Sequence, residues 1–505
     1  MGSKKPRVVI IGGGMAGLTA AHKLYTSTTS FDLHVVEGGT RIGGRINTSQ
    51  FCGDRVELGA TWIHGIQGSP IYKIAQDTTL LHSHHPWECM DGFPHVPLTA
   101  AEGGHHLHPS LLTPISNLFK NLMDFIQGRD CQAASSSSSS AQIIKHCIDR
   151  NRNLSVGSFL RSGLDAYWGV SPTEDTRSVG KWRRKPLEAA VFAMHENTQR
   201  SFTAADDLHT LDYEAERHYV MFPGEEITIA RGYSAVIDSL ASVLPAGVVQ
   251  LGRKVEKIEW RLVGDSSRPV KLHFGDGSTL SADHVIVTVS LGVLKRGIGE
   301  DRSMFDPPLP SPKIRAIKRL GFGVVDKVFV QQSSGCELPS LQMAFHAADS
   351  ELRNPSIPEW MRRTSAIYPI YRGSRVCLAW FTGKEALEVE DLSEEEIING
   401  FSATASDFLS LDFKFGKALR TRWGTNPLFF GSYSYVAVGS TIADMDTLSE
   451  PLPEELGGST PRLQIMFAGE ATHAAHYSTT HGAYFSGLRE ANRLLQHYNI
   501  NVASL

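Results

Sequence analysis

Residues 7–37 read RVVIIGGGMAGLTAAHKLYTSTTSFDLHVVE, and this stretch decides the fold. Its first five residues form a short apolar run, the pattern of a central parallel strand. A glycine-rich turn then leads into a segment whose apolar residues keep helical spacing, and a second apolar run ends at Glu37. The pattern predicts a βαβ unit of the kind that binds dinucleotides.

Each glycine of the turn has a physical task in such a unit. Gly12 permits a tight turn, Gly14 lets the backbone approach a pyrophosphate, and Gly17 allows the helix to pack against the strand. Ala16 belongs to the helix start, where backbone N–H groups and the positive end of the helix dipole attract phosphate. Glu37 has the spacing of an acid that binds a ribose diol. The alternative is a plain strand-to-helix turn, and the fingerprint alone does not separate NAD from FAD.

Two further segments, TRIGGR at 40–45 and ELGATWIHG at 57–65, separate these possibilities. With them the sequence resembles the flavin-dependent amine oxidase family, which implies FAD as the cofactor. By this resemblance Arg45 reaches the pyrophosphate or the flavin, and Ala60 and Thr61 run beside the isoalloxazine. The cofactor-binding residues implied in these segments are Arg41, Gly44, Arg45, Ala60 and Thr61.

Matches later in the chain extend the resemblance to nearly its full length. Glu470, with Gly469, corresponds to the family's ribityl-binding acid, and Thr480 opens the last helix beside the flavin pyrimidine edge. A helix N-terminus there would stabilise negative charge arriving on the ring. Val255 matches the residue that closes over the adenine, although it also fits a core strand. The segment 431–435 lacks the cysteine that tethers flavin in some relatives, so FAD is expected to be non-covalent.

Within the family the likeness is greatest to polyamine oxidases, and among those to the intracellular plant type acting on spermine and thermospermine. The resemblance implies hydride transfer from the carbon beside an amine nitrogen to flavin N5. The imine is then hydrolysed to an aldehyde and a shorter amine, and dioxygen reoxidises the flavin to give hydrogen peroxide. We expect the back-conversion type. The alternatives are another flavin amine or amino-acid oxidase on the same fold, or a non-catalytic flavin-binding module.

Lys327 is the expected catalytic residue, because the resemblance gives it the task of holding a water against flavin N5. A lysine inside an apolar strand is costly unless it is hydrogen-bonded or faces a cavity. The alternative is an edge-strand lysine that faces solvent.

Four residues are predicted to bind the substrate. Tyr433 and Tyr477 match the rings that flank it, and aromatic faces attract a desolvated cation by up to about 2 kcal/mol. Trp62 and His64 come from the 57–65 segment, and His64 would hydrogen-bond a substrate nitrogen. Two core tyrosines and a capped loop histidine are the alternatives. The acids that hold the distal ammonium groups stay open among Glu214, Glu216, Glu225 and Glu226.

Strand-rich and helix-rich segments alternate along the chain, and this order predicts two interleaved domains. The fold class is α/β plus α+β, with a Rossmann-like FAD-binding domain and a substrate-binding domain that combines a mixed sheet with helices. We expect residues 130–141, which are rich in serine, to form a flexible surface loop. The FAD-binding domain comprises 1–85, 226–312 and 440–505, and the substrate-binding domain comprises 86–225 and 313–439.

Composition narrows the partners and the compartment. The 505 residues carry a formal net charge of −4 and no Lys/Arg run, which excludes an electrostatic nucleic-acid surface. No apolar stretch of about 18 residues predicts a membrane span, and no signal-peptide pattern is present. The six cysteines and the histidine-rich loops lack metal-ligand spacing, so no metal is expected. We expect a cytoplasmic monomer whose partners are a small polyamine and O2.

Overall fold

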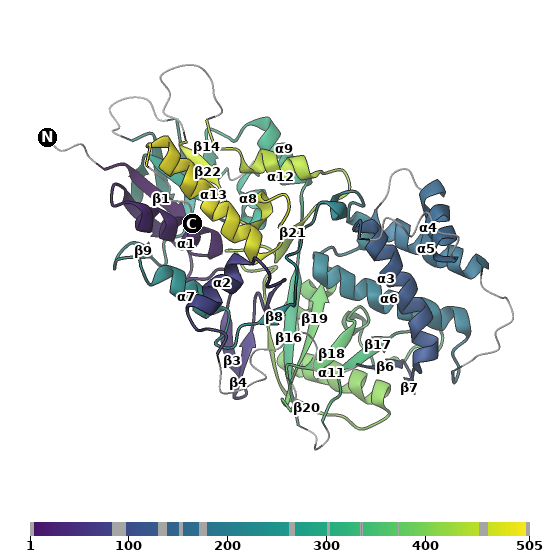
Figure 1. Cartoon of the computed structure of the whole chain (residues 1–505). Helices are drawn as coiled ribbons and strands as arrows, with labels where there is room; N and C mark the ends of the chain where they lie inside the picture. Colours follow the sequence, from purple (N-terminus) through teal and green to yellow (C-terminus); the bar gives the residue numbers. More distant parts are fainter. Residues whose placement is uncertain are drawn as a thin grey trace.

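The computed structural model describes residues 5–82, 97–129, 139–150, 155–170, 179–261, 268–299, 303–333, 335, 337–371, 373–453 and 463–500. Figure 1 shows two regions side by side, and the first and last described elements of the chain, in purple and yellow, lie in one of them. The seven-stranded sheet and helices α3–α6 form the other. Both regions are built from segments that lie far apart in the sequence.

A parallel sheet of five strands forms the core of the first region, in the order β22-β13-β1-β2-β9. The predicted βαβ unit is confirmed as its centre, because β1 pairs in parallel with β2 and helix α1 connects the two. The apolar run of β1 is buried, as expected for a strand between two parallel neighbours. The strands are β1 (Arg7–Ile11), β2 (Asp32–Val36), β9 (Val249–Gln250), β13 (His284–Val287) and β22 (Ile465–Phe467).

Helices α1 (Met15–Ser27) and α13 (Thr480–His497) pack along each other, as Figure 1 shows, and α7 (Ser234–Ala241) also contacts α1. The buried side chains of α1 and α13, with those of β1 and β13, form one apolar cluster over the sheet. The last helix of the chain therefore completes a layer that begins with the first one.

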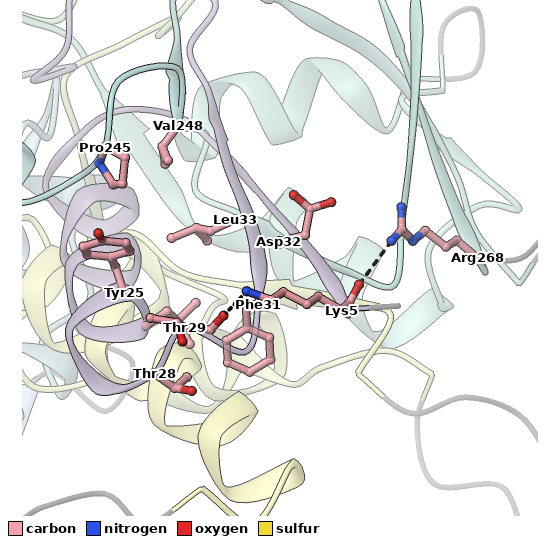
Figure 2. Close-up of a pocket in the computed structure, with 11 residues that line it drawn as sticks. Lys5, Tyr25, Thr28, Thr29, Phe31, Asp32, Leu33, Pro245, Val248 and Arg268 are labelled. Carbon is pink, nitrogen blue, oxygen red and sulfur yellow. Dashed lines mark hydrogen bonds between the residues drawn. The ribbon is translucent and has the colours of Figure 1, made fainter. Parts of the chain in front are cut away.

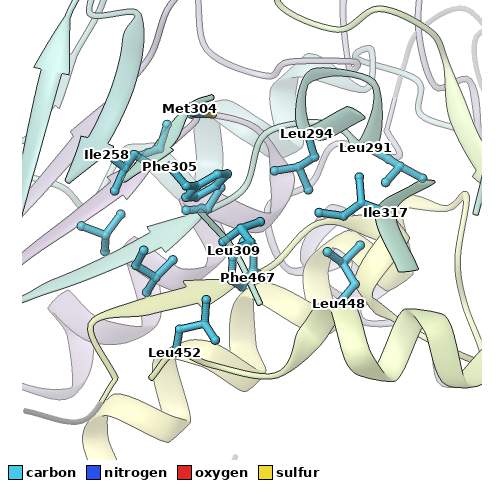
Figure 3. Close-up of a cluster of buried hydrophobic side chains, with 14 of the residues drawn as sticks. Ile258, Leu291, Leu294, Met304, Phe305, Leu309, Ile317, Leu448, Leu452 and Phe467 are labelled. Atoms are coloured by element: carbon cyan, nitrogen blue, oxygen red, sulfur yellow. The ribbon is translucent and has the colours of Figure 1, made fainter. Parts of the chain in front are cut away.

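A second apolar cluster lies on the other side of the parallel sheet (Figure 3). There Phe305 and Phe467 meet with ring centroids 6.2 Å apart, which joins β14 to β22. The four-stranded sheet of this cluster has the order β12-β11-β10-β14. Its elements are β10 (Val255–Glu259), β11 (Val270–Phe274), β12 (Thr279–Ala282), β14 (Phe305–Asp306), α8 (Leu291–Gly297), α9 (Ser311–Arg319) and α12 (Ile442–Ser449).

The second region is built on a mixed sheet of seven strands in the order β20-β16-β19-β18-β17-β6-β7. Its only parallel pair among the described strands is β17 with β6. The strands are β6 (Leu98–Ala101), β7 (His105–His106), β16 (Val325–Gln332), β17 (Leu341–Ala344), β18 (Ala366–Pro369), β19 (Val376–Thr382) and β20 (Phe415–Arg420).

Helices flank this sheet, and the remaining described strands form short pairs outside the larger sheets. The helices are α3 (Pro109–Ile126), α4 (Ser139–Arg150), α5 (Val156–Val170), α6 (Arg184–Thr203), α10 (Lys384–Asp391) and α11 (Glu394–Leu409), with α2 (Pro70–Asp77) in the first region. The paired short strands are β3 (Thr48–Phe51) with β4 (Asp54–Glu57), β5 (Trp62–Ile63) with β8 (Ile227–Thr228), and β15 (Gly321–Gly323) with β21 (Tyr433–Tyr435). The 3₁₀ turns are η3 (Leu208–Thr210), η4 (Ala215–Arg217), η5 (Glu359–Met361) and η6 (Glu470–Thr472).

The predicted fold class is confirmed, whereas the predicted domain boundaries stay a prediction. Residues 130–138 lie outside the described part, and residues 139–141, expected in the serine-rich loop, instead begin helix α4. Among the described helices, each is too short or too polar to cross a bilayer.

Candidate active site

The start of helix α1 offers a cradle for a diphosphate. The first N–H groups of any helix lack intrahelical partners. Helix α1 has no side-chain cap and no acid in its first turn, so these groups are open to a ligand. A Cβ atom at Gly14 would meet no heavy atom nearer than 3.8 Å, that of the Gly43 carbonyl, whereas one at Gly17 would lie 2.0 Å from the Gly12 oxygen. Gly17 thus permits the close contact of helix and turn, and Gly14 leaves the cradle open. Gly12, Gly14, Ala16 and Gly17 all lie at the carboxyl end of β1, as predicted.

Glu37 lies at the carboxyl end of β2 and fixes the neighbouring turns. Its carboxylate accepts hydrogen bonds from the backbone N–H groups of Gly13 at 2.8 Å and Gly39 at 2.7 Å. The Glu37 carbonyl also accepts from the Arg253 N–H at 2.7 Å, which brings the start of β10 alongside. Val255 is therefore placed close to the Glu37 turn, with its side chain in the core. Both interpretations of Val255 remain compatible with this position.

The two arginines of the 40–45 segment differ in their partners. Arg41 donates to the carbonyls of Ile46 at 2.9 Å and Gly44 at 2.7 Å, so it braces its own loop. Arg45 reaches across the fold to the Ser432 carbonyl at 2.7 Å and the Glu470 carboxylate at 2.9 Å. The structure therefore gives Arg41 a role in shaping the loop, and its predicted contact with the cofactor stays a prediction.

Glu470 joins three segments at the carboxyl end of β22. Its buried carboxylate accepts from Arg45, from the Ser434 hydroxyl and from the Ser478 N–H at 2.8 Å. Gly469, just before it, donates its N–H to the Ser486 hydroxyl at 2.9 Å. Thr480 begins helix α13 as predicted, and its hydroxyl hydrogen-bonds with that of Tyr233 at 2.6 Å.

A pocket of about 440 Å³, shown in Figure 2, lies elsewhere. Its lining includes Asp32, the first residue of β2, so it opens at the amino end of the sheet, away from the glycine turn. Lys5 and Arg268 on its rim already donate to the Thr29 carbonyl at 2.6 Å and the Asp283 carboxylate at 2.9 Å. Because ligands of open parallel sheets bind at the carboxyl ends of the strands, this pocket is not part of the dinucleotide site.

Lys327 lies inside β16, which pairs with β19 on one side and β20 on the other. The side chain is buried, so the alternative of a solvent-facing edge lysine is wrong. Its Nζ atom donates to the carbonyls of Glu57 at 2.7 Å and Gly59 at 2.6 Å and to the Thr61 hydroxyl at 2.5 Å. Lys327 therefore contacts residues 57–61, which are predicted to run beside the flavin. Ala60 lies between two of the residues that accept from Nζ, Gly59 and Thr61.

The environment of Lys327 changes its proton affinity. Burial lowers the pKa of the Lys327 amine to about 7, although the nearby Glu57 carboxylate opposes this shift. Nζ also lies 4.5 Å from the ring centroid of Trp380, which stacks on Trp62 with centroids 6.0 Å apart. A buried amine that titrates near neutrality suits a residue with a chemical role.

The predicted substrate residues Tyr433 and Tyr477 lie near Tyr219, and these three tyrosines form an aromatic cluster. The Tyr477 ring meets Tyr219 edge to face, with centroids 5.2 Å apart. Tyr433 donates its hydroxyl to the Ser201 carbonyl, and burial with the Tyr219 hydroxyl nearby raises the pKa of Tyr433 above its usual range. The buried Tyr477 hydroxyl, by contrast, has no hydrogen-bond partner of good geometry among the described residues.

The four candidate acids differ in how deeply they are buried and in their partners. Glu214 and Glu225 are exposed. Glu216, on the turn η4, is buried, and burial raises its pKa to about 7. Its charge acts on both Tyr219 and Tyr477, so it belongs to the aromatic cluster. Glu226 accepts from His64 Nδ1 at 3.0 Å, and this hydrogen bond lowers the pKa of Glu226.

Sequence reasoning did not identify Trp380, Tyr219 or the pairing of His64 with Glu226. Trp380 lies in the apolar strand β19, where nothing in the local pattern distinguishes a core tryptophan from one beside a catalytic group. Tyr219 follows the acid-rich stretch that contains Glu216, and that proximity was the one available signal. Within the described ranges, no three His, Cys, Asp or Glu side chains gather as a metal site requires.

The parallel sheet with its open glycine cradle, and the buried lysine held at residues 57–61, are features expected of a dinucleotide-dependent oxidoreductase. A family model described as flavin containing amine oxidoreductase matches residues 15–495. The chain belongs to this family, and FAD is its cofactor, held without a covalent bond. The open cradle at Gly14 and the uncapped start of α1 fit the pyrophosphate of that group.

Named relatives match the chain over almost its whole length. It is 53% identical to "Probable polyamine oxidase 5" of Arabidopsis thaliana, over 99% of this chain and 100% of the relative. It is 43% identical to "Polyamine oxidase 1" of Oryza sativa subsp. japonica, over 99% and 98% of the two chains. It is also 32% identical to the human "Peroxisomal N(1)-acetyl-spermine/spermidine oxidase", over 97% and 95%.

Proposed function

We propose that this chain oxidises polyamines of the spermine and thermospermine class. The observation that carries the proposal is the set of acids around the aromatic cluster, with Glu216 buried beside Tyr219 and Tyr477 and Glu226 paired with His64. Carboxylates and ring faces together complement a flexible chain that bears several ammonium groups. The names of two relatives include the words polyamine oxidase, which supports the coarser part of the proposal.

Each group of residues has a proposed task. Bound FAD would take a hydride from the carbon beside a secondary amine and pass the electrons to dioxygen, and water would hydrolyse the imine to an aldehyde and a shorter amine. We assign to Lys327 the holding of a water against flavin N5, because its amine is held at the 57–61 segment. Tyr433, Tyr477 and Trp62 would confine the aliphatic chain, and His64 would orient a nitrogen.

Cofactor residues are proposed on the same basis. The turn at Gly12, Gly14, Ala16 and Gly17 would hold the pyrophosphate, and Glu37 the ribose. Arg45, Glu470 and the start of α13 at Thr480 would line the flavin. Further contacts are proposed for Arg41, Gly44, Ala60, Thr61, Val255 and Gly469.

Mass spectrometry of the products tests the proposed reaction. We expect spermine and thermospermine to be shortened to another polyamine with one equivalent of hydrogen peroxide, which is the back-conversion outcome. Leucine should give no peroxide above background. Peroxide from leucine but not from spermine would replace the proposal with an amino-acid oxidase, and a terminally cleaved product would overturn back-conversion alone.

Glu216→Gln should raise the KM for spermine about tenfold, equivalent to roughly 1.4 kcal/mol, with kcat changed less than about twofold. The reason is that an ammonium group beside this buried acid favours its ionised form, and the amide carries no charge. Steady-state kinetics measures the change. The matched control is Glu214→Gln, two residues away and exposed, which should leave KM unaltered. Equal effects of the two substitutions would remove Glu216 from the binding site.

A further inference from the structure

Two buried carboxyl groups meet directly behind the catalytic strand. Asp326, the neighbour of Lys327 on β16, is 0% exposed, and Glu390 on α10 is 1% exposed. The two carboxyl groups lie close enough to interact. Neither group takes part in the roles assigned above, so their burial needs another explanation.

The hydrogen bonds around the pair favour a proton on Asp326. Asp326 Oδ1 accepts from the Thr421 hydroxyl and from the Trp423 N–H at 3.0 Å. The Glu390 oxygens accept from the N–H groups of Gly424 at 2.6 Å and Thr425 at 2.9 Å. Asp326 Oδ2 is buried and has no hydrogen-bond donor among the described residues. Two neighbouring carboxyl groups in an apolar site do not readily ionise together, and a proton on Oδ2 would let this atom donate to Glu390. Burial and Glu390 accordingly raise the pKa of Asp326 well above its usual range.

The segment that the pair holds leads back to Lys327 by two routes. Thr421 accepts the Lys327 N–H at 2.9 Å and donates its own N–H to the Lys327 carbonyl at 3.0 Å. The indole N–H of Trp423 donates to the Leu58 carbonyl at 3.2 Å. The carbonyls on either side of Leu58, those of Glu57 and Gly59, are the ones that accept from Lys327 Nζ. The result is a closed ring of contacts.

We propose that the Asp326–Glu390 pair is a positioning element that sets Lys327 Nζ against the 57–61 segment. It acts through residues 421–425. In this segment Thr421 hydrogen-bonds with Lys327 of β16, and Trp423 donates to the Leu58 carbonyl. Asp326 and Glu390 are positioning residues because their contacts are with this segment and each other. The proposal depends on the proposed function only where a reaction rate is measured.

Three variants separate positioning from other roles. Asp326→Asn keeps the acceptor oxygen and offers an amide N–H to Glu390, so it should reduce flavin with spermine within about twofold of wild type. Asp326→Leu removes every bond of the side chain and should slow reduction about 10²-fold, the cost of misplacing a group by about 1 Å. Trp423→Phe removes the indole N–H while keeping an aromatic ring at this position, and should slow it about tenfold. If Asp326→Leu does not fold, Trp423→Phe carries the comparison.

A double-mutant cycle tests the connection to Lys327. In a Lys327→Met background, Asp326→Leu or Trp423→Phe should cost no further rate, because the group that they position is gone. Independent losses that multiply would overturn the proposal in favour of a general role in packing. A slow Asp326→Asn would also overturn it, because that result would require the carboxyl group itself.

Hydrogen exchange followed by mass spectrometry provides a readout that needs no substrate. Amide exchange over residues 57–61 should accelerate in Asp326→Leu and in Trp423→Phe, and should match wild type in Asp326→Asn. Unchanged exchange in both of the first two variants would contradict the proposal. If wild type itself is not reduced by spermine, the proposed function fails while this measurement still decides the positioning role.

Discussion

Lys327→Met should slow the reduction of the bound flavin by spermine by about 10²-fold or more, the range expected for loss of a positioned proton-handling group. The substitution removes three hydrogen bonds to the 57–61 segment and the amine whose burial lowers its pKa to about 7. Methionine fills similar space without a charge, so the strand should keep its packing. Anaerobic bleaching of the flavin absorbance in a stopped-flow instrument measures the rate.

The pH dependence sharpens this prediction. The lowered pKa means that the Lys327 amine is cationic below about pH 7 and neutral above it. The wild-type rate should therefore rise through that pH, whereas Lys327→Met should retain only the dependence that the substrate nitrogen imposes. Lys414→Met, at a lysine in an exposed ion pair, is the control and should behave as wild type. Equal rates for wild type and Lys327→Met would exclude Lys327 from the reaction.

Gly14→Val should give a folded protein that binds FAD poorly. A Cβ atom at Gly14 meets nothing in the protein closer than 3.8 Å, so the chain itself tolerates the larger residue, whereas the added methyl groups would occupy the diphosphate cradle. Overfilling such a contact costs about 1–3 kcal/mol, which corresponds to roughly tenfold to 10²-fold weaker binding. Flavin absorbance after gel filtration, with titration of FAD back into the protein, measures the loss.

The control for this prediction uses the other end of the same turn. Gly17→Val places its side chain against the Gly12 carbonyl, where a Cβ would lie 2.0 Å away, so it should lower the midpoint of thermal unfolding as well as the flavin content. Gly14→Val should leave that midpoint of the flavin-free protein close to wild type. Full flavin content in Gly14→Val would place the diphosphate elsewhere.

The parts of the site that the sequence predicted are those fixed by local geometry or by a family motif. The βαβ unit follows from the apolar runs and the spacing of Gly12, Gly14 and Gly17, which act over a few residues. Lys327 stood out because a lysine is rare inside an apolar strand, although only the sheet order shows that this strand is not an edge.

The acids could not be assigned from the sequence, because their burial depends on distant segments. Glu214 and Glu216 are two positions apart, and the turn η4 directs one outward and the other toward Tyr477, which comes from the far end of the chain. The Asp326–Glu390 pair is similar, since two isolated carboxyl residues in separate elements reveal nothing until their helix and strand pack.

The parallel sheet imposes an order on biosynthesis. Strand β1 leaves the ribosome long before β22, which lies two strands away from it in the sheet. The apolar edge of β13 must therefore wait for β22, a period in which unpaired strands are exposed to aggregation. FAD loading should consequently follow the end of translation, and a nascent chain halted before residue 465 should engage chaperones rather than flavin.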